Sequence, residues 1–353
     1  MKIKDHRVLV TGGAGFIGSH LVDCLLVANN EVIVVDDFSS GSYENLSQHA
    51  HNPRLHLEKA DVLDEPAMLS IHRGVELVFH LAARNIRLSL RQPTQVHEVN
   101  ATGTLNVMKA SAAARVKRFL YCSSSEVNGS ADVVPMVEDY HFRPETIYGA
   151  SKLAGEYYTQ VFDRSGWLNT VIARPHNNYG PREHYEGVKG EVIPRFILRA
   201  LAGLPPVVYG DGTQTRDFTY VTETAEFLVN LMESEAAVGQ TFNICRGQEV
   251  SILGIAHLIV ELTRLGRPPE HRPARPHDVM RLFGDPTRLR QTLGAAPRIG
   301  IRDGLIRTIE WFRNHVSITP EVLASMQVEN WGAVQAEPWL ANLGAESAIK
   351  RAD

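Results

Sequence analysis

The sequence has few cysteines, no long apolar run and no excess of positive charge, and each absence excludes a class of protein. Its 353 residues include only Cys24, Cys122 and Cys245. Their wide spacing gives no metal-binding pattern, and their small number is typical of a reducing cytoplasm. No stretch approaches the ~18 consecutive apolar residues of a membrane span. The net charge of −4, from 36 basic and 40 acidic residues, argues against nucleic acid as a partner.

The first residues do not form a secretion signal. Met1-Lys2-Ile3-Lys4 is basic and residues 8–10 are apolar, but the apolar run ends at Thr11-Gly12, too early for a signal peptide. We therefore expect a cytoplasmic protein that binds no metal, membrane or nucleic acid.

Strand and helix patterns alternate in the first half of the chain. Helical patterns include residues 16–28, 96–114 and 151–164, and apolar runs predict strands at 7–10, 31–36, 55–61, 77–81, 118–123 and 169–174. This alternation is typical of an α/β fold with a doubly wound parallel sheet covered by helices on both faces.

The pattern changes after residue 174. Residues 175–190 are rich in Pro, Gly, Asn and His and predict a loop, followed by a helix at 191–202, a strand and turn at 205–212 and a helix at 248–265. We interpret these segments as a smaller C-terminal α/β portion over the carboxyl edge of the sheet, where ligands bind in open α/β sheets. The predicted division is a cofactor domain of residues 1–176 and 217–245, a substrate domain of 177–216 and 246–316, and a loose tail of 317–353.

A glycine-rich turn joins the first predicted strand to the first helix. Gly12, Gly15 and Gly18 permit, in turn, a tight bend, close approach of the backbone to a pyrophosphate, and close helix–strand packing. The helix start then presents its amides and positive dipole end to phosphates. The spacing is G-x-x-G-x-x-G rather than G-x-G-x-x-G, but it keeps the strand–turn–helix context of a dinucleotide site.

Acidic and small residues at the next strand ends extend this predicted site. Asp36 ends the second strand, where a carboxylate can accept both ribose hydroxyls and repels a 2′-phosphate, so we predict NAD rather than NADP. Asp61 ends the third strand and is either a cofactor contact or a solvated strand end. Ala82 and Ala83 follow the fourth strand and leave room for the cofactor.

Tyr148 and Lys152 are four residues apart, one turn apart on one helix face. A phenol with a pKa of ~10 is a poor base at neutral pH, and we expect the lysine to lower this pKa by stabilising phenolate. Tyr148 can then take the proton of an alcohol as its carbon gives hydride to a nicotinamide. Such a pair also occurs by chance, but the glycine turn upstream favours the catalytic interpretation.

Hydroxyl groups follow the fifth predicted strand. Ser123, Ser124 and Ser125 lie where a substrate would bind, and a hydroxyl there can share the alcohol proton, although serines also cap turns. Glu126 is either a general base or an acid at a helix N-terminus.

In this order, the motifs resemble the extended short-chain dehydrogenase/reductase family, specifically its nucleotide-sugar epimerases and dehydratases. The resemblance covers about residues 5–316 and includes segments 11–18, 36–41, 80–83, 100–106, 123–129, 148–152, 174–182 and 214–218. It implies a Rossmann-type domain, bound NAD and a nucleoside-diphosphate sugar as substrate. It also implies that Ser124 is the catalytic hydroxyl, Tyr148 the base and Lys152 its partner.

The full set of predicted contacts follows from these motifs and the resemblance. Cofactor contacts are predicted at Gly12, Gly15, Phe16, Ile17, Gly18, Asp36, Asp61, Val62, Leu81, Ala82, Ala83, Asn100, Tyr148 and Lys152. Substrate contacts are predicted at Arg84, Ser125, Asn128, Asn178, Arg182, Val192, Arg216 and Arg275. Asn178, Arg216 and Arg275 match diphosphate or nucleotide positions, and the arginine fork suits phosphate, although Arg275 could instead form a surface ion pair.

Two departures from the family pattern bear on the reaction. Asn128 stands where many relatives have tyrosine, so the choice of sugar is expected to be unusual. Ser125-Glu126 stands where thymidine-sugar dehydratases carry Asp-Glu, so the acid expected to expel the C6 hydroxyl is missing. Ser-Glu also resembles the GDP-mannose dehydratases and the UDP-glucuronate decarboxylases.

We predict a 4-epimerase that oxidises C4 of the sugar transiently to a 4-keto sugar and returns hydride to the other face. The alternative is a 4,6-dehydratase with Glu126 as the C5 base, and a UDP-glucuronate decarboxylase is third. A non-catalytic NAD sensor would not need Tyr148 and Lys152, and a net dehydrogenase would use the cofactor stoichiometrically. Family members pair two helices per subunit, here near 96–114 and 149–164, so we expect a homodimer.

Overall fold

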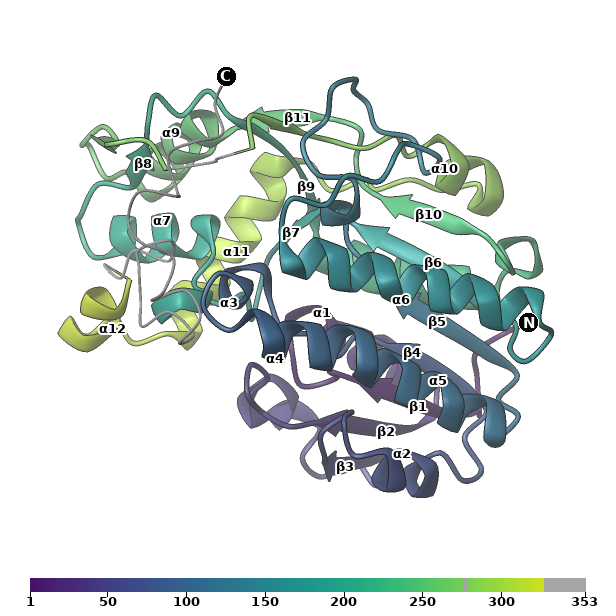
Figure 1. Ribbon diagram of the computed structural model, residues 1–353. Helices are drawn as coiled ribbons and strands as arrows, with labels where there is room; N and C mark the ends of the chain where they lie inside the picture. Colours follow the sequence, from purple (N-terminus) through teal and green to yellow (C-terminus); the bar gives the residue numbers. More distant parts are fainter. Residues whose placement is uncertain (276–278, 327–353) are drawn as a thin grey trace, which may run out of the picture.

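A seven-stranded parallel sheet forms the centre of the computed structural model, which describes residues 1–275 and 279–326 (Figure 1). Its strand order is β10-β6-β5-β4-β1-β2-β3, and each neighbouring pair is parallel. The strands are β1 (Arg7–Thr11), β2 (Glu31–Asp36), β3 (Leu55–Lys59), β4 (Leu77–His80), β5 (Arg118–Cys122), β6 (Thr170–Pro175) and β10 (Thr241–Ile244). The predicted parallel α/β sheet is confirmed, whereas β10 was not predicted.

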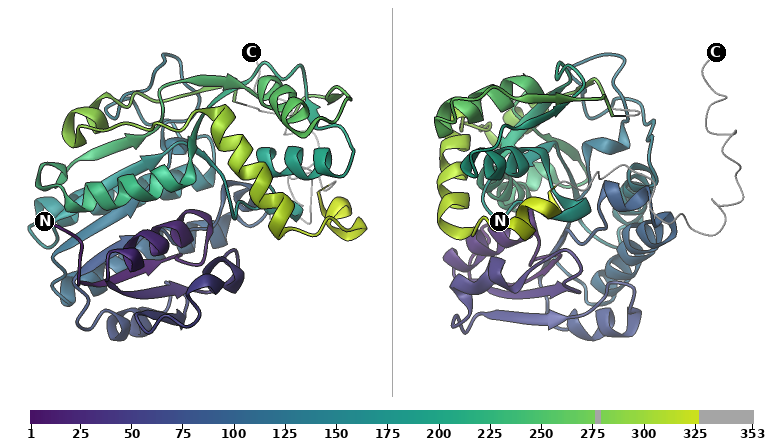
Figure 2. Two further views of the ribbon diagram at one scale, coloured as in Figure 1. Left: turned by 180° about the vertical axis from the view of Figure 1, so that it is seen from behind. Right: turned by 90° about the vertical axis from the view of Figure 1, so that its left-hand side faces the viewer.

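Helices cover both faces of this sheet, which is why its inner strands are buried, whereas the edge strand β3 is polar and mostly exposed. Val8 and Val10 pack toward α1 (Phe16–Val27) and α8 (Val221–Glu233), with α10 (Thr287–Leu293) beside them. The left view of Figure 2 shows the sheet from behind, with α1 in purple lying across the strands. Leu9 belongs to the cluster on the opposite face. That face is covered by α2 (Glu65–Ile71), α5 (Thr104–Ala113) and α6 (Ile147–Arg164). The alternation of side chains along one strand therefore supplies two separate cores.

The predicted helix at 96–114 is interrupted. The structure has α4 (Pro93–His97), a π-helical segment (Glu98–Gly103) and then α5. In the π-helical segment, Asn100 accepts the Arg84 backbone N–H at 2.7 Å and donates to its carbonyl at 3.1 Å. The irregular turn thus fixes the chain that leaves β4, which a regular 3.6-residue period could not indicate.

A second, smaller part lies beside the carboxyl ends of the sheet strands (Figure 1). Its four-stranded sheet joins β9 to β7, β11 and β13, and a separate apolar cluster includes Ile197, Phe218, Ile255 and Leu305. The strands are β7 (Asn177–Tyr179), β8 (Val207–Tyr209), β9 (Thr215–Tyr220), β11 (Glu249–Ser251), β12 (Glu270–Arg272) and β13 (Arg281–Leu282). The helices are α7 (Val192–Leu201), α9 (Ile252–Thr263), α11 (Ile301–His315) and α12 (Pro320–Ser325), and the short α3 (Ile86–Ser89) precedes α4.

Several predictions for this part need correction. The segment 175–190 is not all loop, because it contains β7, and the pattern at 248–265 begins with β11 before α9 starts. The predicted tail contains α12, while its residues 327–353 lie outside the described residues. Among the described residues, no helix is long and apolar enough to cross a membrane.

Candidate active site

A cavity of about 960 Å³ runs along the carboxyl edge of the parallel sheet and reaches into the second part. This volume is at the upper end of the range typical of ligand sites. Its lining brings together predicted residues that are up to 263 positions apart in the sequence, from Gly12 to Arg275. The predicted residues on it are Gly12, Gly15, Phe16, Ile17, Gly18, Asp36, Asp61, Val62, Leu81, Ala82, Ala83, Arg84, Ser124, Ser125, Glu126, Tyr148, Lys152, Asn178, Val192, Arg216 and Arg275.

The glycine turn forms one end of the cavity as a backbone cradle. Gly12 has φ +70°, and a Cβ there would lie 2.7 Å from the Ala82 nitrogen, so the turn admits only glycine. Beyond the turn, Asp36 accepts hydrogen bonds from the Ala14 and Phe38 backbone amides at 3.0 and 2.9 Å. The bare backbone fits a pyrophosphate, and the positioned carboxylate fits a ribose diol, as an NAD site requires.

Arg84 belongs to this same end of the cavity. Its Nη2 lies 2.7 Å from Oδ2 of Asp37, the residue after Asp36. Burial alone would raise the pKa of Asp37, but hydrogen bonds from Ser39 and the charge of Arg84 lower it. The arginine predicted to bind substrate is therefore held beside the dinucleotide cradle.

The start of α6 carries the predicted catalytic pair. Thr146 caps the helix by accepting the Gly149 amide at 3.0 Å, so Tyr148 and Lys152 lie on successive turns facing the cavity. A Cβ at Gly149 would lie 2.5 Å from the Glu126 carbonyl, so only glycine lets this helix approach the Ser125–Val127 turn. Close packing thus brings the tyrosine, the serines and Glu126 to one wall.

The electrostatics of this pair differ from the expectation that Lys152 lowers the pKa of Tyr148. Burial raises the pKa of Tyr148, and a hydrogen bond with Ser124 opposes this shift only in part. Burial also lowers the pKa of Lys152 to about 8, with its Nζ 4.4 Å from the centre of the Tyr121 ring. Tyr148 is therefore a neutral phenol at neutral pH, because desolvation outweighs its hydrogen bond with Ser124.

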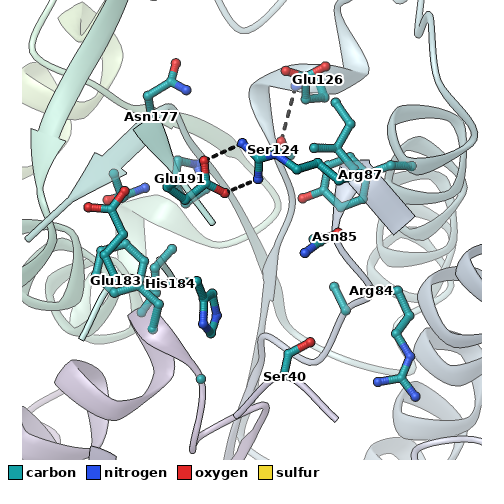
Figure 3. A pocket seen from close by; sticks show the side chains of 18 of the residues that line it. Ser40, Arg84, Asn85, Arg87, Ser124, Glu126, Asn177, Glu183, His184 and Glu191 are labelled. Carbon is teal, nitrogen blue, oxygen red and sulfur yellow. Dashed lines mark hydrogen bonds and ion pairs between the residues drawn. The ribbon is translucent and has the colours of Figure 1, made fainter. Parts of the chain in front are cut away.

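Ser124 and Glu126 lie on the same wall (Figure 3). The Ser124 hydroxyl accepts the Glu126 backbone N–H at 3.2 Å and caps the short turn that follows β5. Burial raises the pKa of the Glu126 carboxyl, although the charges of Arg216 and Arg87 act in the opposite direction. Glu126 thus opens a helical turn and also lines the cavity, and its role as a general base stays a prediction.

The sequence analysis missed an ion pair at the centre of the cavity. Arg87 donates two parallel hydrogen bonds to Glu191, at 2.5 and 2.6 Å (Figure 3). Glu183 lies nearby on the same lining, and burial followed by the charge of Glu191 raises its pKa well above the usual range. These residues carry no recognisable motif, and 104 positions separate Arg87 from Glu191, so only the folded chain reveals the pair.

Three predicted contacts lie outside the cavity lining. Asn100 is fully buried and holds the Arg84 backbone, as described above. Asn128 donates to the carbonyls of Tyr140 and His141 at 3.3 and 3.2 Å. Arg182 pairs with Asp23 at 2.9 Å. In the ligand-free structure these side chains bind other parts of the protein.

Arginines from the second part line the remaining end of the cavity. Arg216 donates to the Val279 carbonyl at 2.6 Å, and the Arg275 guanidinium lies 4.9 Å from the centre of the Tyr209 ring. Arg195, Arg199 and Arg272 also line the cavity and were not predicted. This end is therefore strongly positive and suits a diphosphate. Within residues 1–275 and 279–326, no cluster of His, Cys, Asp or Glu could hold a metal ion.

Comparison with known proteins agrees with this geometry. Residues 8–245 match the model of the NAD-dependent epimerase/dehydratase family. A UDP-glucose 4-epimerase of Mycolicibacterium smegmatis is 35% identical over 311 residues, which is 87% of this chain and 99% of the relative. UDP-glucuronic acid decarboxylase 4 of Arabidopsis thaliana is 37% identical over 90% of this chain and 70% of its own length.

Solved structures give the same result for the fold. The UDP-glucose 4-epimerase of Thermotoga maritima, determined with UDP-glucose, has a TM-score of 0.83 and 34% identity. The match covers 88% of this chain and all of that one. The comparisons thus identify the family, while the named activities within it differ.

Proposed function

The chain belongs to the NAD-dependent epimerase/dehydratase family, and we propose that it acts as a UDP-hexose 4-epimerase. The observation that carries this proposal is the set of groups at the reactive wall. Tyr148, Ser124 and Lys152 provide everything that reversible oxidation at C4 requires, whereas Ser125 stands beside Glu126 without a second acid. The UDP assignment rests on the names of the epimerase and decarboxylase relatives.

In the proposed reaction, NAD supplies the acceptor and then the donor of hydride. With its own proton released to solvent, Tyr148 would accept the proton of the C4 hydroxyl while the C4 hydride would pass to NAD, which leaves the sugar as a 4-ketose. Lys152, with a pKa of about 8, is mostly charged at pH 7 and stabilises the phenolate. Ser124 hydrogen-bonds Tyr148 and is positioned to steady the developing carbonyl. After the ketose has rotated so that its other face is presented to the cofactor, the hydride would return to C4 on that face and Tyr148 would return the proton to the C4 oxygen.

A 4,6-dehydratase is the second candidate, and Glu126 is the observation that favours it. This carboxyl lines the cavity, and its raised pKa suits a group that takes up and releases a proton. In a dehydratase it would take the C5 proton of the 4-ketose and pass it to the C6 hydroxyl, which leaves as water. Epimerisation does not require this carboxyl.

Turnover in deuterated water distinguishes the two reactions. The protein would be incubated with NAD and a panel of UDP-, GDP-, ADP- and dTDP-sugars, and the products analysed by mass spectrometry and NMR. A C4 epimer of unchanged mass without deuterium is the expected result. A product that has lost water and gained deuterium at C5 would reject the epimerase in favour of the dehydratase.

Two further proposals concern organisation. The cofactor part is proposed to comprise residues 1–176 and 217–245, and the substrate part 177–216 and 246–316.

The protein is also proposed to be a homodimer that pairs α5 and α6 with their copies, since Tyr157 and Val161 on α6 are 48% and 44% exposed. Sedimentation velocity at micromolar concentration should give a dimer, and a monomer alone would reject this arrangement.

A further inference from the structure

We propose that Glu191 selects sugars without a carboxylate at C6, by keeping Arg87 paired beside the reacting carbon. This inference rests on the proposed nucleotide-sugar chemistry and deepens it, because it separates neutral hexoses from uronic acids. The two kinds of named relative, a glucose epimerase and a glucuronic acid decarboxylase, differ in this feature of their substrates.

The ion pair lies at the reactive end of the cavity. The charge of Glu191 acts on Tyr148, and that of Glu126 acts on both Tyr148 and Arg87. Arg87 comes from α3, which follows β4, and Glu191 is the N-cap residue of α7 in the second part. The pair therefore bridges the two parts next to the catalytic tyrosine.

The geometry commits the terminal fork of Arg87 to Glu191. The two terminal nitrogens, Nη1 and Nη2, donate to its two carboxylate oxygens. This pair of nitrogens holds one carboxylate at a time in this way. A uronate at this position would have to displace Glu191, which would leave the carboxylate of Glu191 in the cavity without its cation. The protein's own side chain thus takes the place that a substrate carboxylate would need.

The other cations near the pair already have partners. Arg216 acts on the Glu126 carboxyl and donates to the Val279 carbonyl, and the Lys152 ammonium lies over the Tyr121 ring. Glu126 and Glu183 line the same region, and burial raises the pKa of both. These carboxyl groups therefore offer hydrogen-bond partners to the hydroxyls of a neutral hexose and no cation to a sugar carboxylate.

Paired ligands that differ only at C6 test the proposal directly. Binding of UDP-glucose and of UDP-glucuronate to the NAD-loaded protein would be measured by isothermal titration calorimetry. We expect the unmodified protein to bind UDP-glucose at least about 100-fold more tightly, as expected for a like charge placed against a desolvated carboxylate. Binding of the two ligands within about threefold of each other would overturn the proposal without any variant.

A variant tests whether Glu191 causes the preference for UDP-glucose over UDP-glucuronate. In Glu191→Gln, the affinity ratio should narrow to less than about tenfold through tighter UDP-glucuronate binding, because Arg87 becomes available to the substrate. The double variant Arg87→Gln/Glu191→Gln should lose that gain. Glu186→Gln, the same change of charge at an exposed position of the same segment, should keep the original ratio.

The outcomes separate this proposal from the epimerase assignment. An unchanged ratio in Glu191→Gln, or a gain that persists in the double variant, would overturn the role of the pair. Selective binding of UDP-glucose without formation of its C4 epimer would reject the epimerase and still support the selectivity.

Discussion

Replacing Lys152 by methionine should stabilise the cofactor-free protein while abolishing turnover. The Lys152 side chain is only 2% exposed, and burial lowers its pKa from 10.5 to about 8. Below pH 8 this lysine is charged in both the folded and the unfolded chain, so the folded chain bears the full penalty of the buried charge. Above pH 10.5 it is neutral in both states and the penalty disappears, so its contribution to stability rises with pH between these values.

The size of the effect follows from two opposing contributions. At about 1.4 kcal/mol per pH unit, the difference between the two pKa values corresponds to a penalty of about 3 kcal/mol at pH 7. The contact of the ammonium with the Tyr121 ring, at 4.4 Å, offsets about 1–2 kcal/mol of it. Methionine fills a similar volume, and the hydrogen bond from the Tyr121 hydroxyl to the backbone carbonyl at 152 remains. The free energy of unfolding of Lys152→Met should therefore be about 1–2 kcal/mol higher than that of the original protein at pH 7.

Urea unfolding followed by tryptophan fluorescence measures this gain, since the chain contains 4 tryptophans. Both proteins must first be freed of bound nucleotide, as judged by their absorbance at 260 and 280 nm. The advantage of the variant should shrink as the pH rises from 8 to 10.5. A variant less stable than the original by 1 kcal/mol or more, or a difference that does not change with pH, would refute the reasoning.

Other substitutions address the chemistry, the cofactor cradle and the core. Tyr148→Phe should lower turnover by about 10²–10⁴-fold with NAD binding intact, and near-normal turnover would remove Tyr148 from proton transfer. Glu126→Gln should leave an epimerase within about tenfold of its rate, whereas a larger loss of product formation would point to the dehydratase. Gly18→Ala should reduce both NAD affinity and melting temperature, because its Cβ would lie 2.1 Å from the Gly12 carbonyl oxygen; unchanged values in calorimetry would contradict the tight turn. Arg174→Met leaves the Glu156 carboxylate, which Arg174 binds at 2.6 Å, buried without its cation. The free energy of unfolding, measured in urea, should fall by about 3–5 kcal/mol, and Arg174→Met/Glu156→Leu should recover most of this loss.

Most of the sheet could be predicted from the sequence because its inner strands are apolar and buried on both faces, whereas β3 is mostly exposed. The run at 31–36 coincides with β2, and the other predicted strands agree with the structure to within two residues. β10 and β9 escaped prediction, since Thr241–Ile244 is only four residues long and Thr215–Tyr220 carries Arg216 and Asp217. Their positions are fixed by pairing with distant strands, so local composition carries little signal of them.

The site was predicted where a local motif carried it and missed where only tertiary contact creates it. The glycine turn, Asp36 and the Tyr148–Lys152 pair each have a fixed spacing, and the structure brings them to one cavity. The Arg87–Glu191 pair has no such spacing. The direction of the Tyr148 pKa was also predicted wrongly, because the sequence indicates the neighbouring cation but not the depth of burial.

The late return of the chain to β10 bears on the order of folding. Thr241 pairs with Ile172 across about 70 intervening residues, and those residues include β7, α7, β8, β9 and α8. Pairing β10 with β6 closes this long segment into a loop, which is entropically unfavourable until the helices and strands within the segment have packed. A nascent chain that has reached residue 176 already contains every predicted NAD contact, yet one edge of β6 is still unpaired, and unpaired edges favour aggregation. The proposed cofactor part is therefore not contiguous in the chain, because its sheet is completed only after residues 177–216 of the proposed substrate part have been synthesised.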